Sequence, residues 1–217
     1  NISLSELSSA LDANWNGYEK MRLKIQNDPH KYGNHEEESD FYAAAISEFI
    51  LNKINNIPNE RGGVYKLDMH SARTFIEQGK KTLASADGRK SGEILSKNGT
   101  PCDGMDKNGA TALIESAINL KPVNFHESFG LDVMLHPSAV EGKEGLSVFK
   151  ALLKTYMDNG GMTMQFNIFN SETLRDAQRH PEKYKNLQVR VCGWNVLWNN
   201  LSRNEQEAYI KRAENIK

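Results

Sequence analysis

The sequence has few cysteines, no long apolar run and no surplus of charge of one sign. Its 217 residues include two cysteines, and 27 Lys and Arg balance 28 Asp and Glu. Two cysteines cannot build a disulfide scaffold, which favours a reducing, cytoplasmic compartment. The apolar stretches are too short to cross a membrane. The balanced charge gives no basic footprint for nucleic acid, so we expect neither a membrane nor a nucleic acid as a partner.

The residues that are present are typical of a folded domain. Hydrophobic residues and glycine together make up about 45% of the chain, an ordinary globular proportion, which is enough to build a buried core. The chain starts at Asn1 with neither a methionine nor a signal-like apolar stretch, and its first residues already have a helical pattern. This beginning predicts a piece of a longer protein.

The N-terminal half combines helices with a polar stretch. Ser3 and Glu6 have the spacing of a capping box, and apolar residues then recur at helical intervals up to residue 25. A break over residues 28–34 separates this segment from a second helix with an acidic first turn. A strand is predicted over residues 64–69, followed by a long glycine-rich stretch to residue 108.

Helices and strands alternate in the C-terminal half. The pattern predicts strands at 131–135 and 162–169, and helices at 110–120, 145–157, from 171 onward and at 202–214. Such alternation predicts an α/β fold with a largely parallel sheet. The second strand carries Thr163, Gln165 and Asn167 on one face, where they either support a neighbouring segment or satisfy backbone groups.

One short segment between the last two helices has an unusual composition. Residues 187–196 place a single glycine, Gly193, among apolar and β-branched residues. Glycine inside a strand marks a bulge or a close approach of another backbone or ligand. On pattern alone, the simpler interpretation is a bent strand that contributes Cys192 and Trp194 to the core.

The order of the residues in this segment indicates a more specific function. Arg190-Val191-Cys192-Gly193-Trp194 resembles the radical signature of glycyl radical enzymes, in which Arg-Val, a small residue, glycine and an aromatic residue follow one another. Trp194 stands where Tyr or Phe is more usual. Similar family blocks occur at residues 87–93, 106–112, 164–167 and 181–184. The resemblance runs in order from about residue 3 to residue 214.

This resemblance implies a fold and a division of the chain. The fold would be the C-terminal part of the family's ten-stranded α/β barrel, with the radical loop at 189–196 followed by a C-terminal helix at 202–214. Residues 1–108 would supply a helical segment, a strand and a glycine-rich loop of the barrel. Residues 109–217 would form the glycyl radical domain.

The resemblance also assigns the chemistry. Gly193 would carry the radical, because an α-carbon without a side chain can flatten and share the unpaired electron between amide nitrogen and carbonyl. Arg190, Val191, Cys192 and Trp194 would support the loop, with Arg190 pairing with a carboxylate. A radical-SAM activating enzyme would remove the hydrogen from Gly193.

The partner thiol is expected elsewhere. In the family, the radical passes from glycine to a cysteine, which eliminating members carry in a Gly-Cys-x-Glu context. Neither Cys102 nor Cys192 has that context, so the thiol is expected outside this chain and the isolated chain should be inactive. No metal or nucleotide site is expected, since residues 79–82 and 88–91 lack P-loop spacing and residues 35–39 lack a second histidine.

A second resemblance indicates the branch of the family. Residues 131–138 are similar to a His-Pro-Ser strand end of the diol-dehydratase-like branch, which makes His136 and Ser138 candidate neighbours of a substrate pocket. The alternative is a strand that Pro137 simply ends.

The favoured activity is therefore that of a lyase or dehydratase that cleaves a C–O, C–N, C–S or C–C bond of a small polar substrate. The alternatives are pyruvate formate-lyase (formate C-acetyltransferase) and a non-catalytic, separate glycyl radical subunit that completes or repairs a partner enzyme. The full enzyme is expected to be a homodimer.

Overall fold

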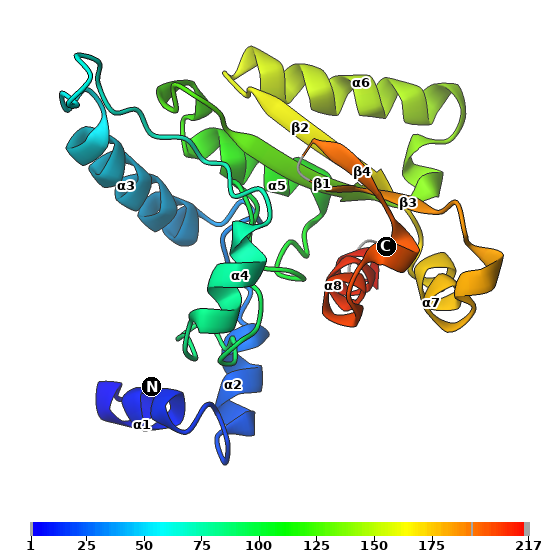
Figure 1. The fold of residues 1–217 in the computed structure, drawn as a ribbon, viewed down its shortest axis with the longest axis horizontal. Helices are drawn as coiled ribbons and strands as arrows, with labels where there is room; N and C mark the ends of the chain where they lie inside the picture. The colour runs from blue at the N-terminus through cyan, green and yellow to red at the C-terminus, as the bar shows by residue number, and fades with distance from the viewer. Residues whose placement is uncertain (1, 192, 215–217) are drawn as a thin grey trace.

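The computed structural model of the chain describes residues 2–191 and 193–214 (Figure 1). Its helices are α1 (Leu4–Asp12), α2 (Glu19–Gln26), α3 (Glu37–Ile54), α4 (Thr74–Lys81), α5 (Gly109–Asn119), α6 (Gly142–Asp158), α7 (Ser171–Arg179) and α8 (Arg203–Glu214). Its strands are β1 (Gly130–Leu135), β2 (Thr163–Ile168), β3 (Gln188–Val191) and β4 (Trp194–Leu197). Cys192 lies outside the described residues.

The strands form two small sheets. β1 and β2 are parallel, in a continuous register that runs from Gly130 opposite Thr163 to Leu135 opposite Ile168. Helix α6 makes the crossover between them, as parallel strands require. β3 and β4 form an antiparallel hairpin with Val191 opposite Trp194. The predicted α/β class, its parallel strand pair and its C-terminal helix are confirmed.

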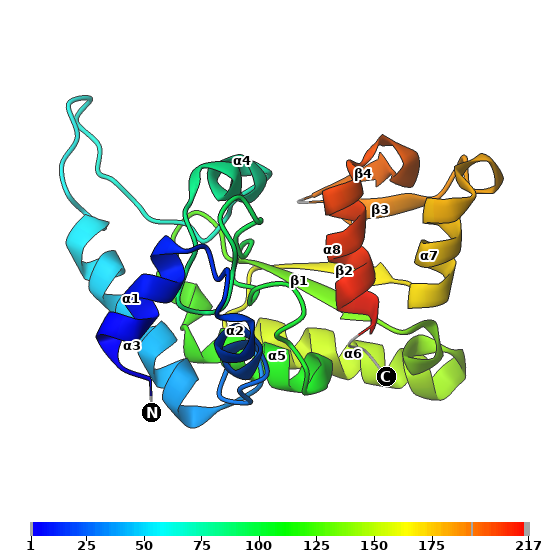
Figure 2. The ribbon, with the colours of Figure 1, turned by 90° about the horizontal axis from the view of Figure 1, so that it is seen from below.

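The β1–β2 sheet lies between two different layers. Helices α5 and α6 cover one face, and the β3–β4 hairpin and α8 lie on the other (Figure 2). All six residues of β1 are buried, so both of its faces are covered. Because side chains alternate along a strand, Leu131, Val133 and Leu135 belong to one face and Asp132 and Met134 to the other.

Two apolar clusters follow this layering. The first joins the odd-numbered residues of β1 to α5, α6 and part of α3, and includes the buried ring of Tyr156. The second is built almost wholly from residues after 168. Trp198 and Ile210, both fully buried, lie at its centre, and Met134 is its buried contribution from β1. The hairpin, α7 and α8 thus share a small core of their own.

The helices begin where local signals place them. Ser3 Oγ accepts a hydrogen bond from the Glu6 N–H at the start of α1. At α8, the backbone N–H and the hydroxyl of Ser202 both donate to Glu205 Oε2, at 2.8 and 2.7 Å. The capping box at α8 is therefore confirmed, and at α1 the Ser3 side chain caps the helix as its spacing predicted.

Two N-terminal features differ from the prediction. The helical segment up to residue 25 is broken into α1 and α2, because Asn14 and Trp15 adopt positive φ angles that a helix does not allow. Trp15 is fully buried at this break, and its indole N–H donates to the Arg89 carbonyl at 3.1 Å. This tertiary contact explains why the helix ends early.

The predicted strand at residues 64–69 is wrong. Val64 forms an isolated antiparallel bridge with Pro58, whereas Met69 forms an isolated parallel bridge with Phe129. Residues 65–68 between these two bridges pair with neither segment as a strand, so no continuous ladder of backbone hydrogen bonds forms. Helix α4 lies inside the stretch that the sequence presented as irregular.

Candidate functional site

Gly193 lies at the tip of the β3–β4 hairpin. Its φ angle is +99°, a conformation that favours glycine. A Cβ atom built at this position would find no other atom within 4 Å, so glycine is required here by the backbone conformation and not by crowding. Val191 on one side is buried, and Trp194 on the other is 45% exposed.

Two amide side chains of β2 hold the hairpin. The Gly193 N–H donates to Gln165 Oε1 at 2.6 Å. Asn167 makes two hydrogen bonds to the backbone of Arg190: its Nδ2 donates to the carbonyl at 3.0 Å, and its Oδ1 accepts from the N–H at 2.8 Å. Gln165 and Asn167 are buried, whereas Thr163 on the same face is exposed. Two of the three polar residues of this strand therefore support the hairpin.

Arg190 has a different partner from the one predicted. Its Nη1 donates to Asn195 Oδ1 at 3.2 Å, and no ion pair of the described residues includes it. Asn195 is its direct cross-strand neighbour in the hairpin. Because both residues are exposed on the same face, the short amide is within reach and no carboxylate is needed to fix the guanidinium.

A buried ion pair lies beside Gln165. Asp132 is the register partner of Gln165 in the parallel sheet, and its Oδ1 is 3.0 Å from Lys97 Nζ, with both side chains almost completely buried. Asn98 Nδ2 donates to the other oxygen of Asp132 at 2.6 Å. Burial is the largest single influence and would by itself lower the pKa of Lys97, but the Asp132 carboxylate, together with Tyr209 and Asp103, outweighs burial and raises the pKa.

Helix α8 connects this ion pair to the hairpin. Buried Arg212 donates to the Asp132 carbonyl at 2.7 Å and lies 3.7 Å from Asp106 Oδ2. The Tyr209 hydroxyl donates to the Arg190 carbonyl at 2.9 Å, and Lys97 Nζ lies 5.3 Å from the centre of the Tyr209 ring. We call Lys97, Asp132 and Arg212 the buried charge cluster.

The buried charge cluster was not predicted from the sequence. Lys97 and Arg212 reach Asp132 from positions 35 residues before it and 80 residues after it in the chain, a proximity that no spacing rule encodes. One signal was present, because Asp132 interrupts the otherwise apolar run Leu131–Leu135. A lone carboxylate inside a buried strand requires a partner.

His136 and Ser138 lie just beyond the C-terminal end of β1. His136 Nδ1 is 2.7 Å from Ser138 Oγ, and the two residues flank Pro137, which begins the short 3₁₀-helix η2 (Pro137–Val140). His136 follows Asp132 by four residues, which corresponds to roughly 13 Å along a strand. The structure therefore brings His136 and Ser138 to each other, beyond the end of β1.

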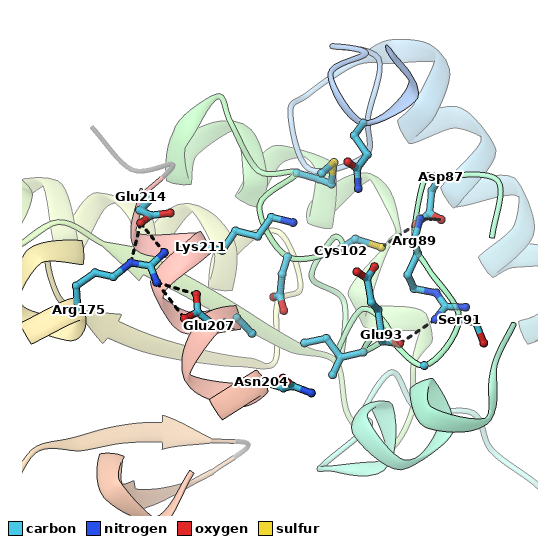
Figure 3. Close-up of a pocket in the computed structure, with 16 residues that line it drawn as sticks. Asp87, Arg89, Ser91, Glu93, Cys102, Arg175, Asn204, Glu207, Lys211 and Glu214 are labelled. Carbon is cyan, nitrogen blue, oxygen red and sulfur yellow. Dashed lines mark hydrogen bonds and ion pairs between the residues drawn. The ribbon is translucent and has the colours of Figure 1, made fainter. Parts of the chain in front are cut away.

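A separate cavity of about 760 Å³ lies between α8 and the loop of residues 87–105 (Figure 3). Its walls are charged, and Arg175 bridges Glu207 and Glu214 at 2.8 and 2.9 Å. None of the described residues that line it belongs to the hairpin. The Cys102 thiol faces this cavity and donates to Asp87 Oδ2 at 3.4 Å. Burial and the nearby Asp87 carboxylate raise the pKa of Cys102 to about 12, so the thiol is neutral at neutral pH.

The described residues hold neither a metal cluster nor a membrane span. Across 2–191 and 193–214, no group of three or more His, Cys, Asp and Glu side chains is arranged to hold a metal ion. No helix in the described part of the chain is long and apolar enough to cross a bilayer.

Two family models match the chain. A model described as glycine radical matches residues 95–199, which include Gly193 and Gln165. A model described as pyruvate formate lyase-like matches residues 1–79. The two spans share no residue and together cover most of the chain.

Curated relatives and solved structures match nearly the whole chain. Trans-4-hydroxy-L-proline dehydratase of Clostridioides difficile is 35% identical over 213 residues, which cover 98% of this chain and 27% of the dehydratase. The 4-hydroxyphenylacetate decarboxylase glycyl radical subunit of Clostridium scatologenes is 37% identical over 91% of this chain and 22% of its own length.

Among solved structures, one from work on 1,2-propanediol dehydration in Roseburia inulinivorans superposes with a TM-score of 0.90 and 34% identity. It covers 97% of this chain and 28% of that one. The chain thus spans about a quarter of the length of the curated relatives it matches.

Proposed function

Because this chain belongs to the glycyl radical enzymes, we propose that it is the radical-bearing, C-terminal part of an anaerobic lyase or dehydratase, with the radical on Gly193. The placement of Gly193 supports this most directly. It is a glycine at an exposed hairpin tip, within the span that the glycine radical model matches, and its N–H donates to the buried Gln165 side chain of β2.

The proposed chemistry begins at the α-carbon of Gly193. The activating enzyme removes one hydrogen atom, so that one electron of the broken C–H bond leaves with the hydrogen and the other stays on the carbon. The carbon radical then takes a hydrogen atom from the S–H group of a cysteine. This step restores the glycine C–H bond and leaves a thiyl radical, which in turn takes a hydrogen atom from the substrate.

The cysteine that receives the radical is proposed to lie in another part of the enzyme. Cys102 faces the charged cavity and donates a hydrogen bond to Asp87, away from the hairpin. Cys192 lies outside the described residues, and by its position next to Gly193 we assign it a supporting role in the loop. On this basis the isolated chain should not turn over substrate.

Elimination is favoured over acyl transfer as the overall reaction. The two relatives named above are a dehydratase and a decarboxylase, which break C–O and C–C bonds. The similarity of residues 1–79 to the pyruvate formate lyase-like model keeps acyl transfer as the second candidate. A substrate pocket near His136 and Ser138 remains part of the proposal.

The partners follow from the family. We infer a radical-SAM activating enzyme, the remainder of the glycyl radical enzyme, a small polar substrate and a homodimer of the full protein, acting in the cytoplasm. The division of the chain at residue 108 into a barrel segment and a glycyl radical domain likewise remains a prediction.

The test of the radical site is electron paramagnetic resonance after anaerobic activation by the cognate activating enzyme. Wild type should give an organic doublet, split by the one remaining α-hydrogen. Labelling with glycine deuterated at the α-carbon should collapse the doublet toward a single line. Gly193→Ala should abolish the signal, because a side chain hinders flattening of the α-carbon and the approach of the thiol.

Gly62→Ala is the matched control. Gly62 also has a positive φ angle, +79°, and open space where a Cβ atom would lie, so both variants carry a similar backbone cost. A doublet that persists in Gly193→Ala would sink the assignment. A second measurement is exposure of the activated protein to air, which should cut the chain at Gly193 in wild type and leave Gly193→Ala intact.

A further inference from the structure

We propose that Gln165 is a positioning residue for the radical centre, and that its side-chain oxygen sets the electron distribution of the Gly193 peptide through the hydrogen bond to the glycine N–H. This inference rests on the proposed radical at Gly193. It adds a second residue to the site, on a strand that the radical motif itself does not include.

The first step is the rigidity of the acceptor. Gln165 lies in the middle of the continuous β1–β2 ladder, opposite Asp132, and it is only 6% exposed. Its neighbour Phe166 packs on the first apolar cluster, with its ring centre 4.6 Å from that of Phe149. The oxygen that receives the Gly193 N–H is therefore carried by a fixed element.

The second step is the register of the hairpin. The Asn167 side chain forms hydrogen bonds with both the backbone N–H and the backbone carbonyl of Arg190. The Tyr209 hydroxyl of α8 donates to the same carbonyl. Three residues further along, the Gly193 N–H meets Gln165. Because the Arg190 contacts already fix where β3 lies on β2, the Gln165 contact does not have to dock the hairpin and acts on the peptide at the tip.

The third step is why an exposed glycine has a buried acceptor. Water could satisfy the N–H of an exposed tip residue at no cost in side-chain order. The chain instead presents an amide oxygen at 2.6 Å, slightly shorter than the usual range for an N–H···O bond. The hydrogen bond that the Gly193 N–H donates to this fixed oxygen holds the glycine nitrogen at a defined place and polarises its peptide group.

The electronic consequence concerns the unpaired electron. A radical on the α-carbon is shared with the amide nitrogen, which donates electron density, and with the carbonyl, which withdraws it. An acceptor on the N–H makes the nitrogen a better donor and draws spin density away from the carbon. The splitting of the doublet by the α-hydrogen follows the spin density on the carbon, so it reports directly on this hydrogen bond.

The experiment has two arms, and the first needs no radical. In the unactivated chain labelled with ¹⁵N-glycine, the Gly193 amide is the one of 16 glycine signals lost in Gly193→Ala. Its exchange with solvent should be protected in wild type. In Gln165→Met, which keeps the length but lacks the oxygen, exchange should be on the order of tenfold faster, since a hydrogen bond of ordinary net strength is lost.

The second arm is the doublet of the activated protein. Gln165→Met should retain a doublet with a larger splitting than wild type, and Gln165→Glu, which keeps an acceptor oxygen, should return it to the wild-type value or below. Thr163→Val, an exposed change on the same face of the same strand, should leave exchange and splitting unchanged. A merely structural role would change the amount of radical and not its splitting.

The outcomes separate the two proposals. If Gly193 exchange and the splitting are both unchanged in Gln165→Met, the role of Gln165 is overturned while the radical site stands. If the wild-type protein gives no doublet that depends on Gly193, the proposed function fails, and with it the electronic role of Gln165.

Discussion

The two faces of the β1–β2 sheet are both covered by other elements, yet different kinds of interaction hold them. On one face, Leu131, Val133 and Leu135 pack with Phe166 into the first apolar cluster under α5 and α6. On the other face, Gln165 and Asn167 meet the hairpin through hydrogen bonds, and Asp132 meets Lys97 and Arg212.

The difference teaches what each face can specify. Apolar packing is favourable over a range of geometries because the hydrophobic effect is not directional. Hydrogen bonds require defined distances and angles, and a buried polar group that loses its partner is costly. The hairpin face therefore fixes the position of the hairpin more closely than the apolar face could, but it tolerates fewer changes in geometry. Such a face suits a site that must place one α-carbon.

The largest expected effect is on the polar face. Lys97→Met leaves the Asp132 carboxylate buried without its cation, so we expect the free energy of unfolding to fall by about 3–5 kcal/mol. Urea denaturation followed by circular dichroism measures the change. Adding Asp132→Asn to Lys97→Met removes the orphaned charge and should recover most of the loss. If the double variant is instead as unstable as the sum of the two single variants, the charge cluster is not a coupled pair.

The apolar face should respond by a smaller, simpler loss. Val133, which is 1% exposed and lies opposite Phe166, loses two methyl groups in Val133→Ala. The expected cost is about 2 kcal/mol from lost burial and the cavity left behind. Hydrogen exchange should show Gly193 protection close to wild type, since the hairpin bonds are untouched. Equal loss of protection at Gly193 would mean that the two faces do not act independently.

The smallest effect is at the start of α8, and it depends on pH. Burial opposes ionisation of Glu205, but hydrogen bonds from Ser202 and Arg73 outweigh it and lower the pKa below the ordinary 4.5. The stability gained from this carboxylate is therefore present above pH 4.5 and is lost as the pH falls through the lowered pKa.

Ser202→Ala should remove about 1 kcal/mol at pH 7, and less at pH 3, because the stability that depends on the ionised Glu205 carboxylate is lost progressively as the pH falls. Thermal unfolding at the two pH values measures this. Ser8→Ala, an exposed change inside α1, should show no loss at either pH. A deficit in Ser202→Ala that is the same at pH 3 as at pH 7 would contradict the role of the carboxylate.

Local signals predicted most of the C-terminal half. The Ser202 and Glu205 pair predicted the start of α8, and the alternation of Gln165 and Asn167 with apolar neighbours predicted a strand with a polar face. These patterns succeed because capping bonds and strand alternation depend on residues that are close in sequence. The class of fold followed from them.

The failures involve contacts that the pattern of residues along the chain does not reveal. The β-branched and apolar residues at 64–69 form no strand because their partners, Pro58 and Phe129, lie on different segments. Lys97 meets Asp132 across a separation of 35 residues in the chain. The partner of Arg190 was misjudged because a hairpin, not visible as such in the pattern, brought Asn195 beside it.

If Gly193 carries the proposed radical, its φ angle has a consequence for activation. Full conjugation of an α-carbon radical with both flanking peptide planes requires φ and ψ each near 0° or 180°, whereas the resting φ is +99°. The carbonyl side of the glycine must therefore rotate about the N–Cα bond when the hydrogen leaves. Rotation about the N–Cα bond leaves the N–H in its hydrogen bond to Gln165. The nitrogen therefore stays in place while the carbonyl side of the glycine moves. Only a residue without a side chain can adopt both the starting and the final backbone conformation.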